Sequence, residues 1–469
     1  MMRYGLFIAA SIFLVAASSL ADEPKKEAPA GPVSYFKEVR PILQTNCQGC
    51  HQPAKRGGEY LMTNFEKLLA GGESGNKAVL PGDPVKSHLM EQITPGKDGK
   101  AAMPQNAKPL SEVERALLAR WIKEGAKDDS PASAATRYDM EHPPEYAVAP
   151  VITSVAFSND GQFLAVSAYH EVIVYKADGS EIAARLVGLS ERIEKVVFSP
   201  DSKLLAVAGG SPGRMGELQI WEVATKKLKL SIPVTFDTVY GVSWSPDQKY
   251  LSCGLPDNSI RAYDATTGQQ VLFNGAHSDW VRDTVFSTDG SHIVSVSHDR
   301  AMKLIEFATQ RFVDNITSIT PGALKGGLNA VDRHPKKDEL LCGGADGTPK
   351  IYKMIRTQAR QIGDDFNLLR SFPALPGRIF DCCFSRDGAK IVAGSSLNGV
   401  GEVRVYNADN AQQIAKLEEV GGSIYAVDFN HDGTKVASGG YDGYLRIHDA
   451  ATGKVIKKFF PVPIKEGPK

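Results

Sequence analysis

Short runs in which apolar and polar residues alternate fill the chain beyond residue 147, and each run ends in a turn rich in Asp and Gly. In the first unit, Thr153, Val155 and Phe157 share one side of a predicted strand. A second strand follows over residues 163–167, and a third ends in the aromatic Tyr175. Alternation with a period of two predicts half-buried strands, and the turn residues predict hairpins between them.

The apolar residue and its turn recur along the chain. The copies are Phe157-Ser158-Asn159-Asp160-Gly161, Phe198-Ser199-Pro200-Asp201, Trp244-Ser245-Pro246-Asp247, Phe286-Ser287-Thr288-Asp289-Gly290, Phe384-Ser385-Arg386-Asp387-Gly388 and Phe429-Asn430-His431-Asp432-Gly433, with a degenerate copy at Arg333-His334-Pro335. Their first residues are 41, 46, 42, 47, 51 and 45 positions apart. A four-stranded blade needs about this length. We therefore predict an all-β propeller of seven blades, whose closure the sequence leaves open; a sandwich would not explain a fixed period.

A helical periodicity precedes these strands. Phe36, Val39 and Leu43 fall on one face of a helix that Ser34 can cap, and Pro41 should kink that helix or start a new one. This pattern predicts the first helix of a small all-α domain over residues 35–126.

A second helix begins at the capping box Ser111-Glu112-Val113-Glu114 and ends at Gly125. Its apolar stripe is predicted to be Val113, Leu117, Trp121 and Ile122. We expect this helix to cross the first one.

The remaining segments show neither the strand alternation nor the helical periodicity. Residues 1–21, with Arg3 before an uncharged apolar run and Ser19-Leu20-Ala21 at its end, are typical of a signal peptide. The alternative, an uncleaved membrane anchor, is disfavoured because the apolar core is shorter than the ~20 residues that span a bilayer. Residues 22–34 are predicted to be a disordered spacer, residues 127–146 a linker between the domains, residues 147–461 the propeller, and residues 462–469 a tail.

Composition restricts the possible functions. Hydrophobic residues make up 42% of the chain and charged residues 23%, which is ordinary for a globular protein and excludes a multi-spanning membrane protein. The 54 Lys and Arg residues balance 54 Asp and Glu residues, so charge gives no support to a nucleic-acid partner. We expect no stable membrane span after signal cleavage.

Two of the six cysteines lie in Cys47-Gln48-Gly49-Cys50-His51, the pattern of covalent c-type haem attachment. Residues three apart on a helical turn share a face, so both thiols can bind one porphyrin, and His51 is placed to ligate the iron. A redox disulfide or half of a zinc site is the alternative for any Cys-x-x-Cys. The other four cysteines lie in apolar runs and receive no chemical role.

The iron of a haem c needs a second axial ligand, for which Met103 is the best candidate. It stands in a loop before Pro104, which cannot extend a helix. Thioether ligation would raise the reduction potential relative to two imidazoles. Met62, Met90 and His88 are alternatives, the last two because residues 87–93 form a short predicted helix.

The segment from Tyr35 to Ala126 resembles the planctomycete-type cytochrome c domain. The resemblance rests on Val39-Arg40-Pro41-Ile42-Leu43, the haem motif, Gly71-Gly72-Glu73-Ser74-Gly75, Pro81-Gly82-Asp83-Pro84, Met103-Pro104 and Arg120-Trp121-Ile122-Lys123-Glu124-Gly125-Ala126. It implies a small all-helical domain that holds one covalent haem c, with His51 and Met103 as iron ligands.

The repeating units resemble WD repeats. The Asp that this family carries in the turn before the third strand matches Asp257, Asp299, Asp346 and Asp442. The Gly-His signature is mostly missing, with Ala276-His277 as the nearest match, so the buried polar network of many WD blades is not expected throughout.

These features lead to two functional hypotheses. The first is an exported, periplasmic c-type cytochrome that transfers single electrons and uses its propeller to dock a redox partner protein. The second is a haem-bearing interaction scaffold or redox sensor. An oxidoreductase with a second active site in the propeller is less favoured, because its histidines show no ligand spacing and no catalytic residue can be assigned.

Overall fold

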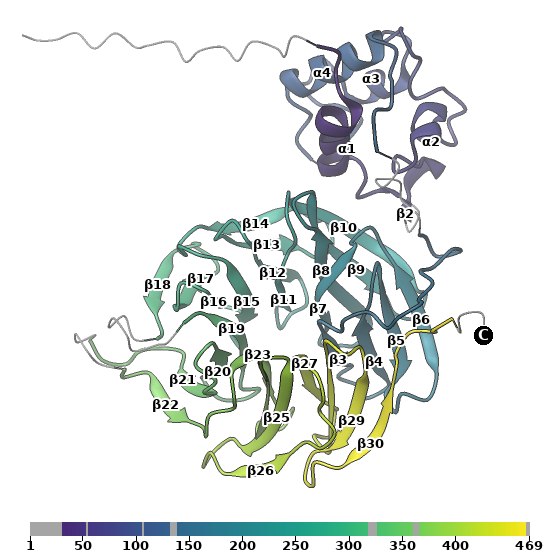
Figure 1. Ribbon diagram of the computed structural model, residues 1–469. Helices are drawn as coiled ribbons and strands as arrows, with labels where there is room; N and C mark the ends of the chain where they lie inside the picture. The colour runs from purple at the N-terminus through teal and green to yellow at the C-terminus, as the bar shows by residue number, and fades with distance from the viewer. Residues whose placement is uncertain are drawn as a thin grey trace, which may run out of the picture. The chain divides into compact units, whose positions relative to one another are not determined.

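The computed structural model describes residues 31–52, 55–105, 107–131, 138–317, 326–359 and 365–465 (Figure 1). The predicted signal peptide (residues 1–21) and most of the predicted spacer (22–34) lie outside these residues, as do parts of the predicted linker and tail. Within the described ranges, no helix combines the length and the apolarity that a bilayer crossing needs.

The N-terminal region contains short helices and one small strand pair. The helical elements are the π-helix η1 (Tyr35–Val39), α1 (Arg40–Asn46), the 3-10 helix η2 (Gly57–Glu59), α2 (Phe65–Ala70), α3 (His88–Ile93) and α4 (Glu112–Lys123). Strands β1 (His51–Gln52) and β2 (Lys55–Arg56) pair antiparallel. The description as an all-α domain is therefore corrected to a small region with few helices, because the chain turns back on itself directly after His51.

Pro41 and Trp121 organise the helices of this region. Pro41 lies in the first turn of α1, where an N–H has no partner within the helix, and η1 ends just before it, as predicted. The Trp121 ring is buried and stacks on Tyr35 with 5.5 Å between centroids. The capping box of α4 is confirmed, but its predicted stripe is wrong at Val113, which is 78% exposed, since Leu118 is buried instead.

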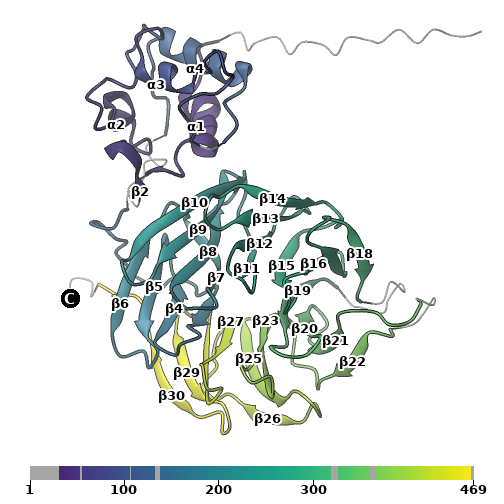
Figure 2. The same ribbon diagram turned by 180° about the vertical axis from the view of Figure 1, so that it is seen from behind.

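Seven four-stranded antiparallel sheets follow, and each uses four consecutive strands (Figures 1 and 2). The first three blades are β3 (Val155–Phe157), β4 (Phe163–Ser167), β5 (Glu171–Lys176), β6 (Ile182–Val187); β7 (Arg192–Phe198), β8 (Leu204–Ser211), β9 (Met215–Glu222), β10 (Lys227–Thr235); and β11 (Gly241–Trp244), β12 (Tyr250–Gly254), β13 (Ile260–Asp264), β14 (Gln270–Asn274). Blades four and five are β15 (Val281–Phe286), β16 (His292–Ser297), β17 (Met302–Glu306), β18 (Phe312–Asn315); and β19 (Leu328–Arg333), β20 (Glu339–Gly344), β21 (Lys350–Lys353), β22 (Leu368–Ser371). Blades six and seven are β23 (Arg378–Phe384), β24 (Lys390–Leu397), β25 (Val400–Asn407), β26 (Gln413–Lys416); and β27 (Ile424–Phe429), β28 (Lys435–Gly440), β29 (Leu445–Asp449), β30 (Val455–Phe459). The predicted seven-bladed propeller is confirmed.

The repeated Ser-x-Asp sequence closes the turn between the first two strands of most blades. In blade one, the Ser158 hydroxyl donates to Asp160 at 2.6 Å and accepts from the Phe163 N–H at 2.9 Å. The same hydroxyl-to-carboxylate bond joins Ser199 to Asp201, Ser245 to Asp247, Ser287 to Asp289 and Ser385 to Asp387. This side-chain turn fixes the hairpin locally, which is why the motif recurs.

A carboxylate–cation pair spans the next turn in four blades. The pairs are Asp257–Arg261, Asp299–Lys303, Asp346–Lys350 and Asp442–Arg446, each four residues apart. Blade four also keeps a buried polar network, in which His277 contacts Asp299 through Nδ1 and Ser295 through Nε2, both at 2.8 Å. The network expected to be rare is thus present where Ala276-His277 occurs.

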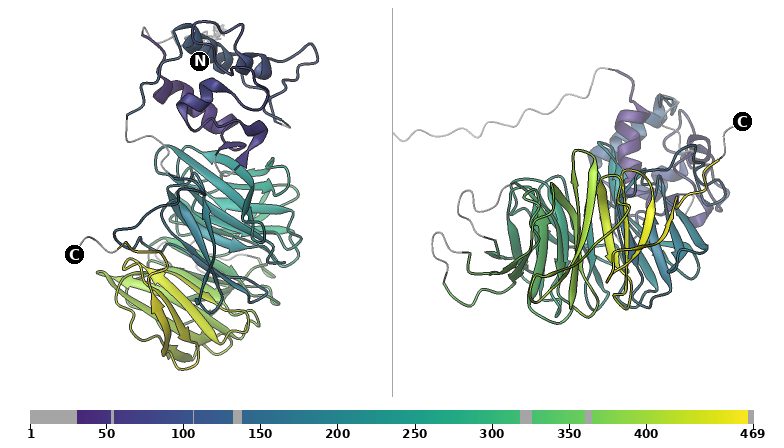
Figure 3. Two further views of the ribbon diagram at one scale, coloured as in Figure 1. Left: turned by 90° about the vertical axis from the view of Figure 1, so that its right-hand side faces the viewer. Right: turned by 60° about the horizontal axis from the view of Figure 1, so that its bottom comes forward.

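The ring closes without exchanging a strand between its first and last blades. Sheets β27–β30 and β3–β6 lie side by side in Figures 1 to 3, and the Asp428 carboxylate accepts the Phe157 N–H at 2.7 Å across their boundary. The Tyr175 hydroxyl donates to the Pro461 carbonyl at 3.0 Å, and Tyr146 forms an isolated parallel bridge with Ile464. Side-chain contacts and these terminal segments together hold the ring shut.

Asp299→Asn tests the network of blade four. Burial alone raises the pKa of Asp299, but the hydrogen bond and charge of His277, with the Ala301 and Ser278 N–H groups, lower it to about 2. Because this pKa is depressed in the folded state, the stabilisation is present above the ordinary value of about 3.9 and is lost as pH falls toward 2. At pH 7 the variant should lose about 2 kcal/mol of unfolding free energy.

Thermal unfolding by circular dichroism at pH 7 and pH 3 checks this expectation. The gap between the wild-type chain and the variant should narrow at the lower pH. Glu141→Gln, at an exposed side chain, is the control and should change little. An equal loss in both variants, or a gap independent of pH, would contradict the assigned role of Asp299.

Candidate functional site

The Cys-x-x-Cys-His motif forms a single turn at the end of α1. The Cys47 N–H donates to the Leu43 carbonyl at 2.9 Å, and the Cys47 carbonyl accepts the N–H groups of Cys50 at 3.1 Å and His51 at 3.2 Å. The helix therefore continues its hydrogen-bond pattern into the motif. This turn brings both thiols and the imidazole of the predicted site into one short segment.

The two thiols are free but differ in their surroundings. Cys50 is exposed, whereas Cys47 is half-buried and packs against the apolar core. Burial, reinforced by the neighbouring Cys50 and Glu114, raises the pKa of Cys47 to about 12. At neutral pH Cys47 is a thiol and not a thiolate.

His51 is held by its backbone while its ring keeps an unpaired nitrogen. The His51 carbonyl accepts the Met62 N–H at 2.9 Å. Burial lowers the pKa of the imidazole, with backbone groups of Gly57 and Tyr60 acting in the opposite direction, so the ring is neutral at pH 7. Its Nδ1 is buried and has no hydrogen-bond partner among the described residues.

A cavity beside this turn brings several of the candidate ligands together. Its lining includes Cys47, Cys50, His51, Tyr60, Met62, His88 and Met103. The Met103 N–H donates to the Gln92 carbonyl at 2.9 Å, which ties its loop to α3. His88 contacts Glu91 at 2.9 Å, and Met90 packs against the apolar core. In the described part of the chain, His, Cys, Asp and Glu side chains form no group of three suited to a metal ion.

Tyr60 and Gly72 belong to this cavity wall, although sequence reasoning gave neither a role of its own. The Tyr60 ring lies 5.2 Å from that of His51, and its hydroxyl donates to the Leu68 carbonyl at 2.7 Å. A Cβ on Gly72 would lie 2.2 Å from the Gly58 carbonyl oxygen and 2.9 Å from the Tyr60 Cβ. The glycine pair Gly71-Gly72 could have indicated this part of the wall from the sequence, since only glycine permits so close an approach to Gly58 and Tyr60.

A second concave site lies at one end of the central channel of the propeller. One residue from each blade lines it, always four positions before the first residue of the repeated motif. These seven residues, which we call the channel mouth, are Thr153, Glu194, Tyr240, Arg282, Asn329, Phe380 and Tyr425. Tyr169 and Tyr441 also line this cavity, and Trp280 contacts Tyr240 with 5.8 Å between ring centroids. We call Tyr169, Trp280 and Tyr441 the aromatic rim.

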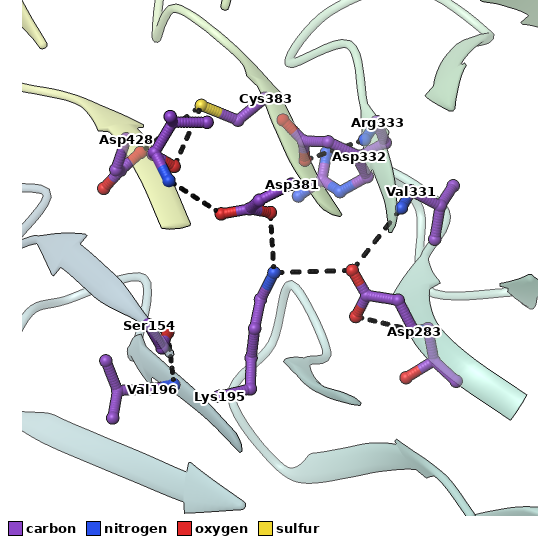
Figure 4. Close-up of polar contacts among 12 residues, drawn as sticks. Ser154, Lys195, Val196, Asp283, Val331, Asp332, Arg333, Asp381, Cys383 and Asp428 are labelled. Carbon is purple, nitrogen blue, oxygen red and sulfur yellow. Dashed lines mark hydrogen bonds and ion pairs between the residues drawn. The ribbon is translucent and has the colours of Figure 1, made fainter. Parts of the chain in front are cut away.

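Lys195 forms the floor of the channel mouth between two carboxylates. Its Nζ lies 3.2 Å from Asp381 and 3.4 Å from Asp283 (Figure 4). Burial opposes the charge of Lys195, but both carboxylates together raise its pKa well above the ordinary value. Sequence reasoning missed this cluster because Asp283 and Asp381 carry no motif beyond their shared position within the repeat.

Two family models match the chain. The Planctomycete cytochrome C model matches residues 47–106, a range that includes Cys47, Cys50, His51 and Met103. The model of the WD domain, G-beta repeat, matches residues 228–264, 268–306 and 412–449. The resemblance to both families is confirmed over these ranges.

Curated relatives include eukaryotic translation initiation factor 3 subunit I of Aspergillus terreus. It is 27% identical over 269 residues, which are 55% of this chain and 66% of the relative. The subunit I of Kluyveromyces lactis is 24% identical over 280 residues, which are 57% of this chain and 67% of the relative. The chain thus spans about two thirds of the length of these relatives.

These relatives contradict the prediction of an exported, periplasmic cytochrome that carries single electrons to a redox partner. They are named as subunits of a translation initiation factor, and that name supports neither export nor a redox partner. As terms for the whole protein, cytochrome, haem, iron and periplasm give way to WD repeat and β-propeller. The prediction failed for a physical reason. A haem-attachment motif indicates only how a group is bonded locally, and it does not indicate what the much larger propeller does.

Among solved structures, the computationally designed Ika8 protein aligns over 67% of this chain and 90% of that protein. The TM-score is 0.49 and the sequence identity 19%.

The different surroundings of Cys47 and Cys50 predict different reactivity in protein free of any attached group. Cys50 should react with iodoacetamide at pH 8 at least tenfold faster than Cys47, because the Cys47 thiolate is scarce at a pKa of about 12. Mass spectrometry of Cys47→Ser and Cys50→Ser variants, each with one thiol of the motif left, measures the two rates separately. Equal rates would show that Cys47 is not buried as described.

Proposed function

We propose that this protein is an interaction scaffold whose propeller binds a protein partner at the channel mouth. The observation that carries this proposal is the concave ring to which each of the seven blades contributes one side chain, of several chemical types. Concave sites with a few convergent polar groups are where proteins usually bind their ligands. The relatives add support, since they are named as subunits of a larger factor.

The exposed residues of the aromatic rim also favour the channel mouth as the docking surface. Tyr441 is 67% exposed, Trp280 46% and Tyr169 40%. Large aromatic side chains are enriched at the energetic centres of protein interfaces, where one apolar face is buried and a polar tip remains. Their grouping beside a cavity distinguishes them from exposed apolar residues scattered over the outer strands.

We also propose that the N-terminal region holds one haem c through thioethers to Cys47 and Cys50. The donor set fits such a group. Among the described residues, both thiols are unpaired and the buried Nδ1 of the neutral His51 ring has no hydrogen-bond partner, and Met103 lines the same cavity. His51 and Met103 would bind the iron, and the Tyr60 ring packs beside that of His51. When bound, a haem would supply an iron centre that changes oxidation state.

Removing two of the three residues of the aromatic rim should strongly weaken partner capture. A tagged full-length chain with Tyr441→Ala and Trp280→Ala should recover at least tenfold less of its partner from native extract, measured by quantitative mass spectrometry. The matched control carries Phe273→Ala and Phe312→Ala, two exposed aromatics on the outer strands β14 and β18. Equal recovery by the two double variants would refute docking at the channel mouth.

The haem proposal is tested by removing its attachment. Cys47→Ala with Cys50→Ala should eliminate haem that remains bound after denaturation, as measured by absorbance, without changing the thermal unfolding of the propeller. Met103→Ala should remove the sulfur-to-iron absorption band, whereas Met90→Ala should leave it intact. Covalent haem in the double variant would rule out the site, and the reverse pattern in the methionine variants would move the ligand to Met90.

A further inference from the structure

The end of the predicted linker packs against blade one, and we call this segment, residues 138–146, the strap. The Asp139 carboxylate fixes a turn near its start by accepting the N–H groups of Glu141 at 2.9 Å and His142 at 2.7 Å. The Met140 sulfur accepts, at 3.3 Å, the last N–H of the outermost strand β6. The strap therefore belongs structurally to the propeller.

A buried carboxylate anchors the far end of the strap. Glu171 is fully buried, and it accepts two hydrogen bonds from the Arg185 guanidinium, at 2.6 and 2.7 Å, and one from the Tyr146 hydroxyl at 2.7 Å. Arg185 also donates to the Pro144 carbonyl at 2.8 Å. Bidentate, charge-assisted contacts of this kind are among the stronger hydrogen bonds in proteins, so this end of the strap is firmly held.

The C-terminal segment holds the same end from a second direction. The Tyr146 carbonyl accepts the Lys465 N–H at 2.9 Å, next to the bridge between Tyr146 and Ile464. Glu145 and Lys465 form an exposed ion pair at 2.6 Å. The strap is therefore bound both to blade one and to the segment that helps close the ring.

Both ends of the strap contact Tyr169, one of the three residues of the aromatic rim. The Tyr146 hydroxyl lies 3.1 Å from the Tyr169 carbonyl oxygen, so its one proton is shared between this oxygen and Glu171. At the start of the strap, the Tyr138 ring meets the rings of Tyr169 and His170, with centroids 6.0 and 5.3 Å apart. Tyr169 is thus held through its backbone by one end and through its ring by the other.

The hairpin tip that carries Tyr169 needs such support. His170, the next residue, has a φ of 62°, which is uncommon for a residue other than glycine and persists only where neighbours hold the turn. The His170 N–H donates to the Glu191 carbonyl at 3.1 Å, and its carbonyl accepts the Gly188 N–H at 3.0 Å. These bonds fix the backbone of the tip, whereas the ring of Tyr169 depends on the strap.

A short stretch of chain joins the strap to the N-terminal region. Asp129 is held in that region, because its carboxylate accepts the Phe36 N–H at 2.8 Å. Only residues 130–137 lie between Asp129 and the strap, and a fully extended chain of this length spans about 30 Å. A partner that draws the N-terminal region beyond this reach therefore pulls directly on Tyr138.

We propose that the strap positions Tyr169 at the channel mouth, so that the segment leading to the N-terminal region controls docking of the partner. The inference rests on the proposed scaffold function and concerns the regulation of the same site. Tyr138 packs on the rim ring, and Tyr146 holds the backbone beneath it. Release of the strap frees both contacts at once and leaves the hairpin tip without its outer support.

Hydrogen–deuterium exchange of the full-length protein, measured by mass spectrometry, tests the positioning role. Tyr138→Ala should speed exchange of the N–H groups of residues 168–170 about fivefold, the factor that one lost aromatic contact allows. Tyr138→Phe keeps the ring and should keep the wild-type rate. Tyr146→Phe, which removes only the hydroxyl, should also speed exchange. His142→Ala, at an exposed residue of the strap, is the control and should change nothing.

The capture experiment of the aromatic rim then tests control of docking. Tyr138→Ala should recover about threefold less of the partner than Tyr138→Phe, with unchanged thermal unfolding of the propeller. If Tyr146→Phe does not fold, the Tyr138 pair decides alone.

Each contrary result points to a different failure. Equal exchange at residues 168–170 in Tyr138→Ala and Tyr138→Phe would overturn the positioning role. Faster exchange with undiminished recovery would show that the strap does not control docking, and the scaffold function stands if the rim double variant still loses the partner. If the rim double variant also retains the partner, the proposed function fails as well.

Discussion

The propeller depends on satisfying the backbone N–H groups of its innermost strands. These groups face the adjacent blade, and a buried N–H without a partner costs about 1–3 kcal/mol. At five boundaries in the described residues, a side chain of one blade accepts the N–H of the next. The pairs are Ser154–Val196, Asp283–Val331, Asp332–Phe384, Asp381–Val427 and Asp428–Phe157. The last pair closes the ring, so the same interaction serves both neighbouring and terminal blades.

The aspartates that accept these N–H groups place several carboxylates close together inside the channel, and the charge of Lys195 offsets part of their repulsion. Burial raises the pKa of Asp283 and brings that of Asp428 to about 6, because the channel interior disfavours the ionised form. Lys195 occupies the position that Asp283 and Asp381 occupy in their blades, and it offsets both (Figure 4). The cluster that fixes the blades therefore also sets the charge beneath the channel mouth, which links the stability of the ring to what it can bind.

The N-terminal site and the channel mouth were accessible to sequence reasoning to different degrees. Cys47, Cys50 and His51 are contiguous in the chain, so their common turn follows from helical spacing alone. Met103 was selected as the second iron ligand from its place before Pro104, and it lines the same cavity, while the place of Tyr60 depends on a contact with His51 that no local pattern records. The function of the whole protein was predicted wrongly. The haem-attachment motif is contiguous in the sequence, whereas the binding surface of the propeller combines residues from distant blades and forms only on folding.

The sequence by itself determined the seven blades, the Ser-x-Asp turns, the break at Pro41 and the capping box of α4. Each of these depends on residues within a few positions of one another, so periodicity and turn chemistry suffice. Only the tertiary structure decided that Val113 is exposed, how the ring closes, and which polar residues meet at its axis. Residues of the channel mouth such as Tyr240 and Arg282 are more than forty positions apart, and they become neighbours only when packing of the sheets curves the chain into a closed ring.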